Sequence, residues 1–171
     1  MKCTDIHLGC CCKIHTGQCG KCCSEPETFI ATNEESFFLK MLSEIPFLPV
    51  AQFLLTCSHS RHVWSIALSP VFLTDGFDSI ETIRKTSITL KSLEQRGIIT
   101  LDYDLPMSNY NYSLFNESKA FKYFQEVVAE GRERPDFIFD TPAIKYGSLA
   151  LTGFGQDILD FQNFTPSQLL F

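Results

Sequence analysis

Residues 78–115 constrain the fold of this 171-residue chain more than any other stretch. Within them apolar side chains recur at helical spacing, at Ile80, Ile83, Leu90 and Leu93. This spacing predicts one helix over residues 78–96. Gly97 is expected to end that helix, because glycine readily adopts the positive φ found at helix C-termini. The β-branched and apolar residues 98–101 predict a strand, and after a turn the alternating residues 110–115 predict a second strand.

The sequence of residues 86–99 resembles the recognition helix and following strand of winged-helix transcription regulators such as the MarR, ArsR and PadR types. Those proteins carry a leucine, two residues, a second leucine and a glutamate, then two residues, a glycine and two aliphatics. In this chain that pattern falls on Leu90, Leu93, Glu94, Gly97, Ile98 and Ile99. Residues 149–159 are similar to the strand and helix start with which such domains often end. The resemblance implies an α+β, mostly helical fold, with a winged helix-turn-helix body behind a Cys-rich N-terminal segment.

If the resemblance holds, the helix at 78–96 reads DNA. The major groove admits one α-helix, and side chains on the exposed face of that helix contact phosphates and base edges. The face expected to be exposed carries cations and hydroxyls at Arg84, Lys85, Thr86, Thr89, Lys91, Ser92 and Arg96. The alternative is that these residues form the solvated face of an ordinary amphipathic helix.

The charge balance argues against a strongly basic nucleic-acid binder, because the formal net charge is −6. Residues 61–96 are slightly positive, with five basic and four acidic side chains, whereas residues 97–160 carry ten acidic and five basic ones. Any affinity for DNA should therefore be modest for one subunit, and the sequence predicts that a homodimer is needed.

Soft metal ligands are confined to the start of the chain. Seven of the eight cysteines lie within residues 1–25, together with His7 and His15. Thiolate ligation of zinc needs about four ligands, and a Cys-x-x-Cys spacing is the usual chelating turn. An iron–sulfur cluster also needs about four thiolates. The expected ligands are Cys3, Cys10, Cys12, Cys19, Cys22 and Cys23, with Cys11, Cys57, His59 and His62 as possible additions.

Other readings of these cysteines stay open. A disulfide framework suits secreted chains, but no export signal precedes the cysteines, and their odd number pairs badly. Adjacent thiols could instead undergo reversible oxidation, or the segment could be a tail of reactive thiols without metal. Cys57, His59 and His62 could bind a metal, or they could form a polar loop between two helices.

Two regions are expected on this basis. Residues 1–25 form a Cys-rich metal- or cluster-binding segment, and residues 26–171 form a winged-helix domain with C-terminal helices. Hydrophobic spacing and capping residues predict further helices at 33–45, 50–56, 63–73 and 117–130, and a last helix capped by Thr152. Short strands are predicted at 137–139 and 149–151.

The favoured function is a DNA-binding transcription regulator of winged-helix type whose N-terminal cysteines sense a metal, an iron–sulfur cluster or redox state. The alternative is a metal- or cluster-binding winged-helix module that binds another protein and no DNA. An enzyme is not expected, because the chain carries no glycine-rich phosphate loop. No apolar run approaches the roughly 18 residues of a membrane span, and without a signal peptide the protein is expected in the cytoplasm.

Overall fold

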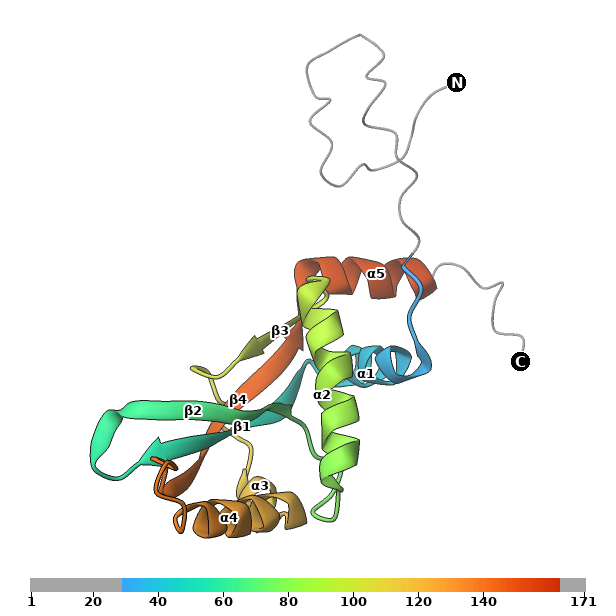
Figure 1. Ribbon diagram of the computed structural model, residues 1–171. Coiled ribbons are helices and arrows are strands. Elements are labelled where there is room, and N and C mark those ends of the chain that lie inside the picture. The colour runs from blue at the N-terminus through green and yellow to red at the C-terminus, as the bar shows by residue number, and fades with distance from the viewer. Residues whose placement is uncertain (1–28, 164–171) are drawn as a thin grey trace, which may run out of the picture. The chain divides into compact units, whose positions relative to one another are not determined.

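The computed structural model describes residues 29–163. The chain divides into two units, residues 1–30 and 31–171, and the second contains the following elements (Figure 1). In chain order they are α1 (Asn33–Glu44), β1 (Phe47–Cys57), β2 (Ser60–Val71), α2 (Ile80–Gln95), β3 (Ile99–Asp102), α3 (Ser113–Glu117), α4 (Lys119–Gly131), β4 (Thr141–Leu151) and α5 (Gly153–Asn163).

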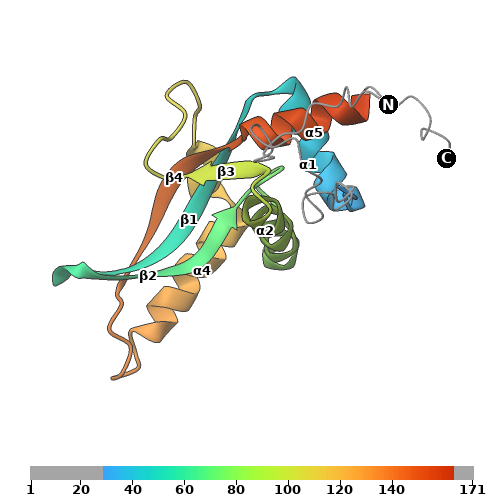
Figure 2. The same ribbon diagram turned by 90° about the horizontal axis from the view of Figure 1, so that it is seen from above.

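The centre of this unit is an antiparallel sheet of four strands in the order β2-β1-β4-β3. The sheet is curled, and the long β1–β2 hairpin extends away from α2 (Figures 1 and 2). β1 pairs with β4 without a register shift from Phe47 opposite Ala150 to Thr56 opposite Thr141. β2 pairs with β1 through several register shifts and lies at the edge of the sheet.

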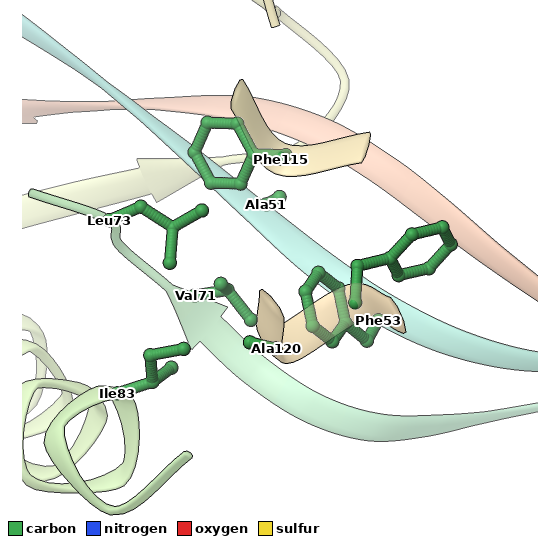
Figure 3. Close-up of a cluster of buried hydrophobic side chains, with 8 residues drawn as sticks. Ala51, Phe53, Val71, Leu73, Ile83, Phe115 and Ala120 are labelled. Atoms are coloured by element: carbon green, nitrogen blue, oxygen red, sulfur yellow. The ribbon is translucent and has the colours of Figure 1, made fainter. Parts of the chain in front are cut away.

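Side chains of β1 point alternately to the two faces of the sheet. One face carries Ala51 and Phe53, and it packs against α3 and α4, where the ring of Phe53 lies 5.1 Å from that of Phe121. The buried cluster on this face comprises Ala51, Phe53, Val71, Leu73, Ile83, Phe115, Ala120 and Phe121 (Figure 3). Removing this apolar surface from water stabilises the fold by roughly 25 cal/mol for each Å².

The helix α2 crosses the end of the sheet near β2 (Figure 1). Its N-cap residue Ser79 accepts a hydrogen bond from the amide of Thr82, and its buried face consists of Ile83, Ser87, Leu90 and Leu93. Ser87 is polar but satisfied, since its hydroxyl donates to the carbonyl of Ser69 at 2.9 Å. Gly97 has a φ of 69°, so a glycine ends this helix as expected.

The expectation of a mostly helical winged-helix body is wrong. Residues 50–56 and 63–73, predicted as helices, form most of the long strands β1 and β2, which gives the unit a curled antiparallel sheet. Both runs are largely apolar, and a short apolar run has no period that separates a buried strand from a buried helix. The predicted second wing strand at 110–115 is also wrong, because turns and the start of α3 lie there and the strand that pairs with β3 is β4.

Several other local predictions are confirmed. The helices expected at 33–45, 78–96 and 117–130 correspond to α1, α2 and α4, and the strand at 98–101 corresponds to β3. Thr152 caps α5, since its hydroxyl oxygen accepts from the amide of Gly155 at 3.0 Å. The strand at 149–151 is the end of β4, whereas 137–139 is a loop rather than a strand.

Within the described part of the chain, no helix combines the length and the apolar character that crossing a membrane requires.

The buried face of α2 supports a stability prediction. Leu93 has no exposed surface, so Leu93→Ala removes apolar contacts and leaves a cavity. The free energy of unfolding should fall by about 2–5 kcal/mol, measured by urea denaturation. Ile88→Ala is the matched control on the same helix, because Ile88 is exposed and its loss should change stability by no more than about 0.5 kcal/mol. Equal effects of the two substitutions would contradict this packing of α2.

Candidate functional site

The residues predicted to read DNA differ in their exposure and in their hydrogen-bond partners. Arg84, Lys85 and Lys91 are exposed on α2, whereas Thr86 and Thr89 are partly buried. The Thr89 hydroxyl donates to the carbonyl of Lys85 within the helix. Lys85 itself lies 3.0 Å from Glu81, and because both side chains are exposed this ion pair contributes little to stability.

Two members of the predicted set have a structural role instead. Arg96 donates to both carboxylate oxygens of Glu35, at 3.0 and 3.1 Å, and the Ser92 hydroxyl donates to the same carboxylate at 2.9 Å. Glu35 is only 3% exposed, and it also accepts from the amide of Thr32 in a capping box at the start of α1. Ser92 and Arg96 therefore join α2 to α1 and are not free to contact a ligand.

This arrangement also sets the charge state of Glu35. Burial raises the pKa of the carboxyl, but hydrogen bonds from Thr32, Ser92 and Arg96 and the charge of Arg96 outweigh burial and leave the pKa below its ordinary value. The carboxylate is thus stabilised in its ionised form inside the fold.

A groove runs between α2 and the C-terminal half of β2. On the helix side the exposed residues Arg84, Ile88 and Lys91 follow one another at spacings of four and three, so they form one stripe. The lining of this first groove is Ile66, Ala67, Leu68, Ser69, Arg84, Ser87, Ile88 and Lys91. Among the residues that the structure describes, no acidic side chain forms an ion pair with either cation of the stripe.

A second groove continues along the β1–β2 hairpin, on the face opposite α4. Leu54 and Ile66 stand opposite each other across the two strands, so the first groove meets the second there. Its lining is Gln52, Leu54, Thr56, Cys57, Ser60, Arg61, Val63, Trp64 and Lys145. We refer to the two grooves together as the open face.

The open face combines exposed apolar surface with positive charge. Trp64 is 58% exposed and Ile88 is 69% exposed, although both are large and apolar. Arg61, Arg84, Lys91 and Lys145 line the grooves, and no acidic residue is among their described lining. Of the cations, Lys145 has an acidic partner, the exposed Asp104 at 2.7 Å.

A hydrogen-bond chain borders the open face. The Gln52 amide donates to the Ser69 hydroxyl at 3.0 Å, and that hydroxyl lies 3.1 Å from the phenol of Tyr103. Burial raises the pKa of Tyr103 above its ordinary value, so the phenol is neutral at physiological pH. The ring of Tyr103 lies against Gly147 of β4, where a Cβ atom would stand 2.7 Å from it. A glycine is therefore needed at this close approach.

The structure brings two of the possible extra metal ligands together with a residue that the sequence did not suggest. Ligand atoms of Cys57, His59 and Asp140 all lie within 4.8 Å of one another. His62, the other candidate from this region, is exposed on β2 and is not part of the cluster. Asp140 could not be found from sequence, because it is 83 residues from Cys57 and reaches it through the pairing of Thr56 with Thr141.

Asp140 is held firmly in this cluster. Its carboxylate accepts from the amide of Ser58 at 2.8 Å, from the Ser58 hydroxyl at 2.5 Å and from the Thr141 hydroxyl at 2.7 Å. These hydrogen bonds, led by that of the Ser58 hydroxyl, hold the pKa of the carboxyl well below its usual range. The backbone carbonyl of Asp140 accepts from the guanidinium of Arg132, which fixes the chain on the other side.

The remaining metal ligands predicted from sequence lie outside the described residues. They are Cys3, Cys10, Cys11, Cys12, Cys19, Cys22 and Cys23.

Comparisons with known proteins add little to this geometry. No protein-family model and no curated protein matches the chain. Among solved structures, an uncharacterized protein from the hydrocarbon-degrading marine bacterium Alcanivorax borkumensis SK2 aligns with 14% identity and a TM-score of 0.40, over 78% of this chain and 87% of that one. So low a TM-score does not establish a common fold.

The buried Glu35 carboxylate should make stability depend on pH. Its pKa in the folded chain is below the ordinary value of 4.5, so the unfolded chain binds more protons through this group than the folded chain does. The stabilisation is therefore present above pH 4.5 and is lost as the pH falls through the folded-state pKa. Urea unfolding over a series of acid pH values should show that this loss is absent in Glu35→Gln.

Glu34→Gln is the control for that experiment, because Glu34 is its exposed neighbour in the first turn of α1. This variant should keep the acid-dependent loss of stability that the wild type shows. A Glu35→Gln profile parallel to the wild-type profile would mean that the carboxylate is not stabilised in the ionised form.

Proposed function

We propose that this protein binds single-stranded nucleic acid along the open face. The observation that carries the proposal is the concentration of cations and exposed apolar side chains there, with no acidic residue in the described groove lining, although the whole chain has a net charge of −6. A charge distribution of this kind attracts a polyanion to one face of an acidic protein.

The chemistry of the open face matches the two requirements of single-strand binding. Proteins that bind single strands combine a positively charged groove, which follows the phosphates, with aromatic side chains on which bases stack. Arg84 and Lys91 supply charge along the first groove, and Arg61 supplies it along the second. Trp64 supplies an exposed aromatic surface between them. Ser60 adds a hydroxyl that can hydrogen-bond to phosphates or base edges.

The same geometry disfavours the alternative in which α2 binds in the major groove of duplex DNA. Ser92 and Arg96, which would extend the reading surface towards the helix C-terminus, are bound to Glu35. The cations Arg84 and Lys91 line a groove whose other wall is β2. They could therefore contact the phosphates of a nucleic-acid strand that lies between α2 and β2. An unpaired strand fits that space, and its unstacked bases remain available to Trp64.

In this proposal the protein acts as a cytoplasmic nucleic-acid-binding factor, and transcription regulation is one role compatible with it. Affinity for one subunit should be modest, because one of the four cations that line the grooves, Lys145, is paired with Asp104, and the chain as a whole is acidic. A homodimer would strengthen binding by placing two open faces on one strand.

Trp64 permits a direct test, because it is the only tryptophan in the chain. Its fluorescence should be quenched when an unlabelled single-stranded DNA oligonucleotide is added, since a stacked base contacts the indole. In a separate assay with a labelled oligonucleotide, Trp64→Ala should weaken binding about tenfold, which corresponds to the loss of one stacked base. Duplex DNA of the same sequence should bind more weakly. Unaltered Trp64 fluorescence at saturating oligonucleotide would contradict the proposal.

The role of the cations can be tested separately through salt dependence. Replacing both Arg84 and Lys91 with alanine should lower the slope of log affinity against log salt by about 1.4, since each phosphate contact on a single strand contributes about 0.7. Lys122→Ala is the control, because Lys122 is exposed on α4, which packs on the opposite face of the sheet. A double variant with the wild-type slope would show that these cations do not contact phosphates.

A second candidate function, docking of another protein, is favoured by the apolar character of the open face. Trp64, Ile66 and Ile88 are exposed together, and contiguous exposed apolar surface usually marks an interaction site. β2 is also an edge strand, which can pair with a strand of another chain.

Sedimentation velocity decides whether the docking partner is a second copy of this protein. If it is, Ile66→Lys should convert a dimer into a monomer. A wild-type monomer at all concentrations would exclude self-association.

A further inference from the structure

The tip of the β1–β2 hairpin carries a cluster of possible metal ligands, of which Cys57 also lines the second groove. Cys57 ends β1, and Ser58 and His59 form the two-residue turn to β2. Asp140 directly precedes β4, and its amide donates to the carbonyl of Thr56 at 3.0 Å. The pairing of β1 with β4 therefore places a thiol, an imidazole and a carboxylate at one end of the sheet.

We propose that Cys57, His59 and Asp140 bind a divalent transition metal of the zinc type. The donor set is the first support. Sulfur and nitrogen ligands select zinc and similar ions, whereas calcium and magnesium prefer sites made of oxygen alone. This inference does not rest on the proposed binding of nucleic acid.

The distances are the second support. Zinc binds sulfur at about 2.3 Å and nitrogen or oxygen at about 2.0–2.2 Å, so ligand atoms around one tetrahedral ion lie roughly 3–4 Å apart. The three ligand atoms here already lie within 4.8 Å of one another. The His59 side chain is 89% exposed, so it can close the remaining gap without moving buried atoms.

The third support is that hydrogen bonds already orient the Asp140 carboxylate. Its Oδ1 already accepts two hydrogen bonds, from the Ser58 amide and the Thr141 hydroxyl, while Oδ2 accepts one, from the Ser58 hydroxyl. A carboxylate has about four acceptor positions, so Oδ2 keeps one, and Oδ2 is the oxygen 3.5 Å from His59 Nδ1. Hydrogen bonds of this kind orient ligating carboxylates in metal sites.

The imidazole of His59 is also oriented within the cluster. Its Nδ1 lies 3.0 Å from the Ser58 hydroxyl, which itself donates to Asp140. Hydrogen bonds of this kind orient histidine ligands in metal sites. Three protein ligands leave a fourth position for water, as in zinc sites that act on a substrate rather than closed structural sites.

The experiment uses the full chain with Cys57 as its only thiol. In this background serine replaces Cys3, Cys10, Cys11, Cys12, Cys19, Cys22 and Cys23. Titration with Co²⁺ under anaerobic conditions should give one bound ion per chain and a thiolate-to-cobalt charge-transfer absorption, and Zn²⁺ should displace the cobalt. Cys57→Ser should abolish the charge-transfer band.

Two further variants in the same background locate the other ligands. His59→Ala and Asp140→Asn should each weaken Co²⁺ binding at least about tenfold. His62→Ala is the matched control, because His62 is an exposed neighbouring histidine outside the cluster, and it should bind as the parent does. Circular dichroism of each variant checks folding. His59→Ala should fold like the parent, because the side chain it removes lies exposed in a turn.

Several results would overturn the assignment. They are the absence of Co²⁺ binding in the parent, a charge-transfer band that survives Cys57→Ser, and equal losses in His59→Ala and His62→Ala.

Discussion

The pairing of β1 with β4 is the interaction on which the rest of this structure depends. It runs from Phe47 opposite Ala150 to Thr56 opposite Thr141 without a shift in register, and it joins residues that are 103 positions apart at one end and 85 at the other. Because side chains alternate along a strand, a shift of one residue would exchange the two faces of β1. The register thus keeps Phe53 in the core against α4, gives the open face Leu54, and brings Asp140 to the hairpin turn.

A second constraint fixes α2 against α1. A carboxylate as buried as that of Glu35 is costly unless it is paired and hydrogen-bonded, and Thr32, Ser92 and Arg96 meet this condition. The same contacts decide which cations of α2 remain available. Arg96 is engaged with α1, whereas Arg84 and Lys91 face the groove beside β2. The pairing of Arg96 with Glu35 therefore limits which cations of α2 could contribute to the proposed binding surface.

The helices α1, α2, α4 and α5 were predictable from sequence because their signals are local. Ile83, Leu90 and Leu93 recur at helical spacing, Gly97 ends α2, and Thr152 caps α5, so residues close in sequence contain the information. β1 and β2 were misread because their apolar runs fit a buried helix as well as a buried strand, and the choice depends on pairing partners far away. Because β1 and β2 were assigned as helices, the open face was not predicted from the sequence, and a winged-helix body was predicted that the structure does not have.

The candidate sites show the same division. Cys57 and His59 were recognised by residue type, but Asp140 enters through strand pairing and no local pattern reveals it. Likewise, residue types along α2 suggested seven contacts to DNA, and only packing shows that Ser92 and Arg96 serve Glu35. Trp64 is exposed on β2, an edge strand for which residues 63–73 were predicted as a helix.

The most direct measurement is amide chemical-shift mapping by NMR of the full chain during titration with single-stranded DNA. Perturbations that follow β1 and β2 near Leu54 and Trp64 and the Arg84–Lys91 stripe of α2, and that leave α4 unchanged, are the result this account predicts. Perturbations confined to α4 or α5, or no perturbation at saturating oligonucleotide, would contradict the claim that the open face binds nucleic acid.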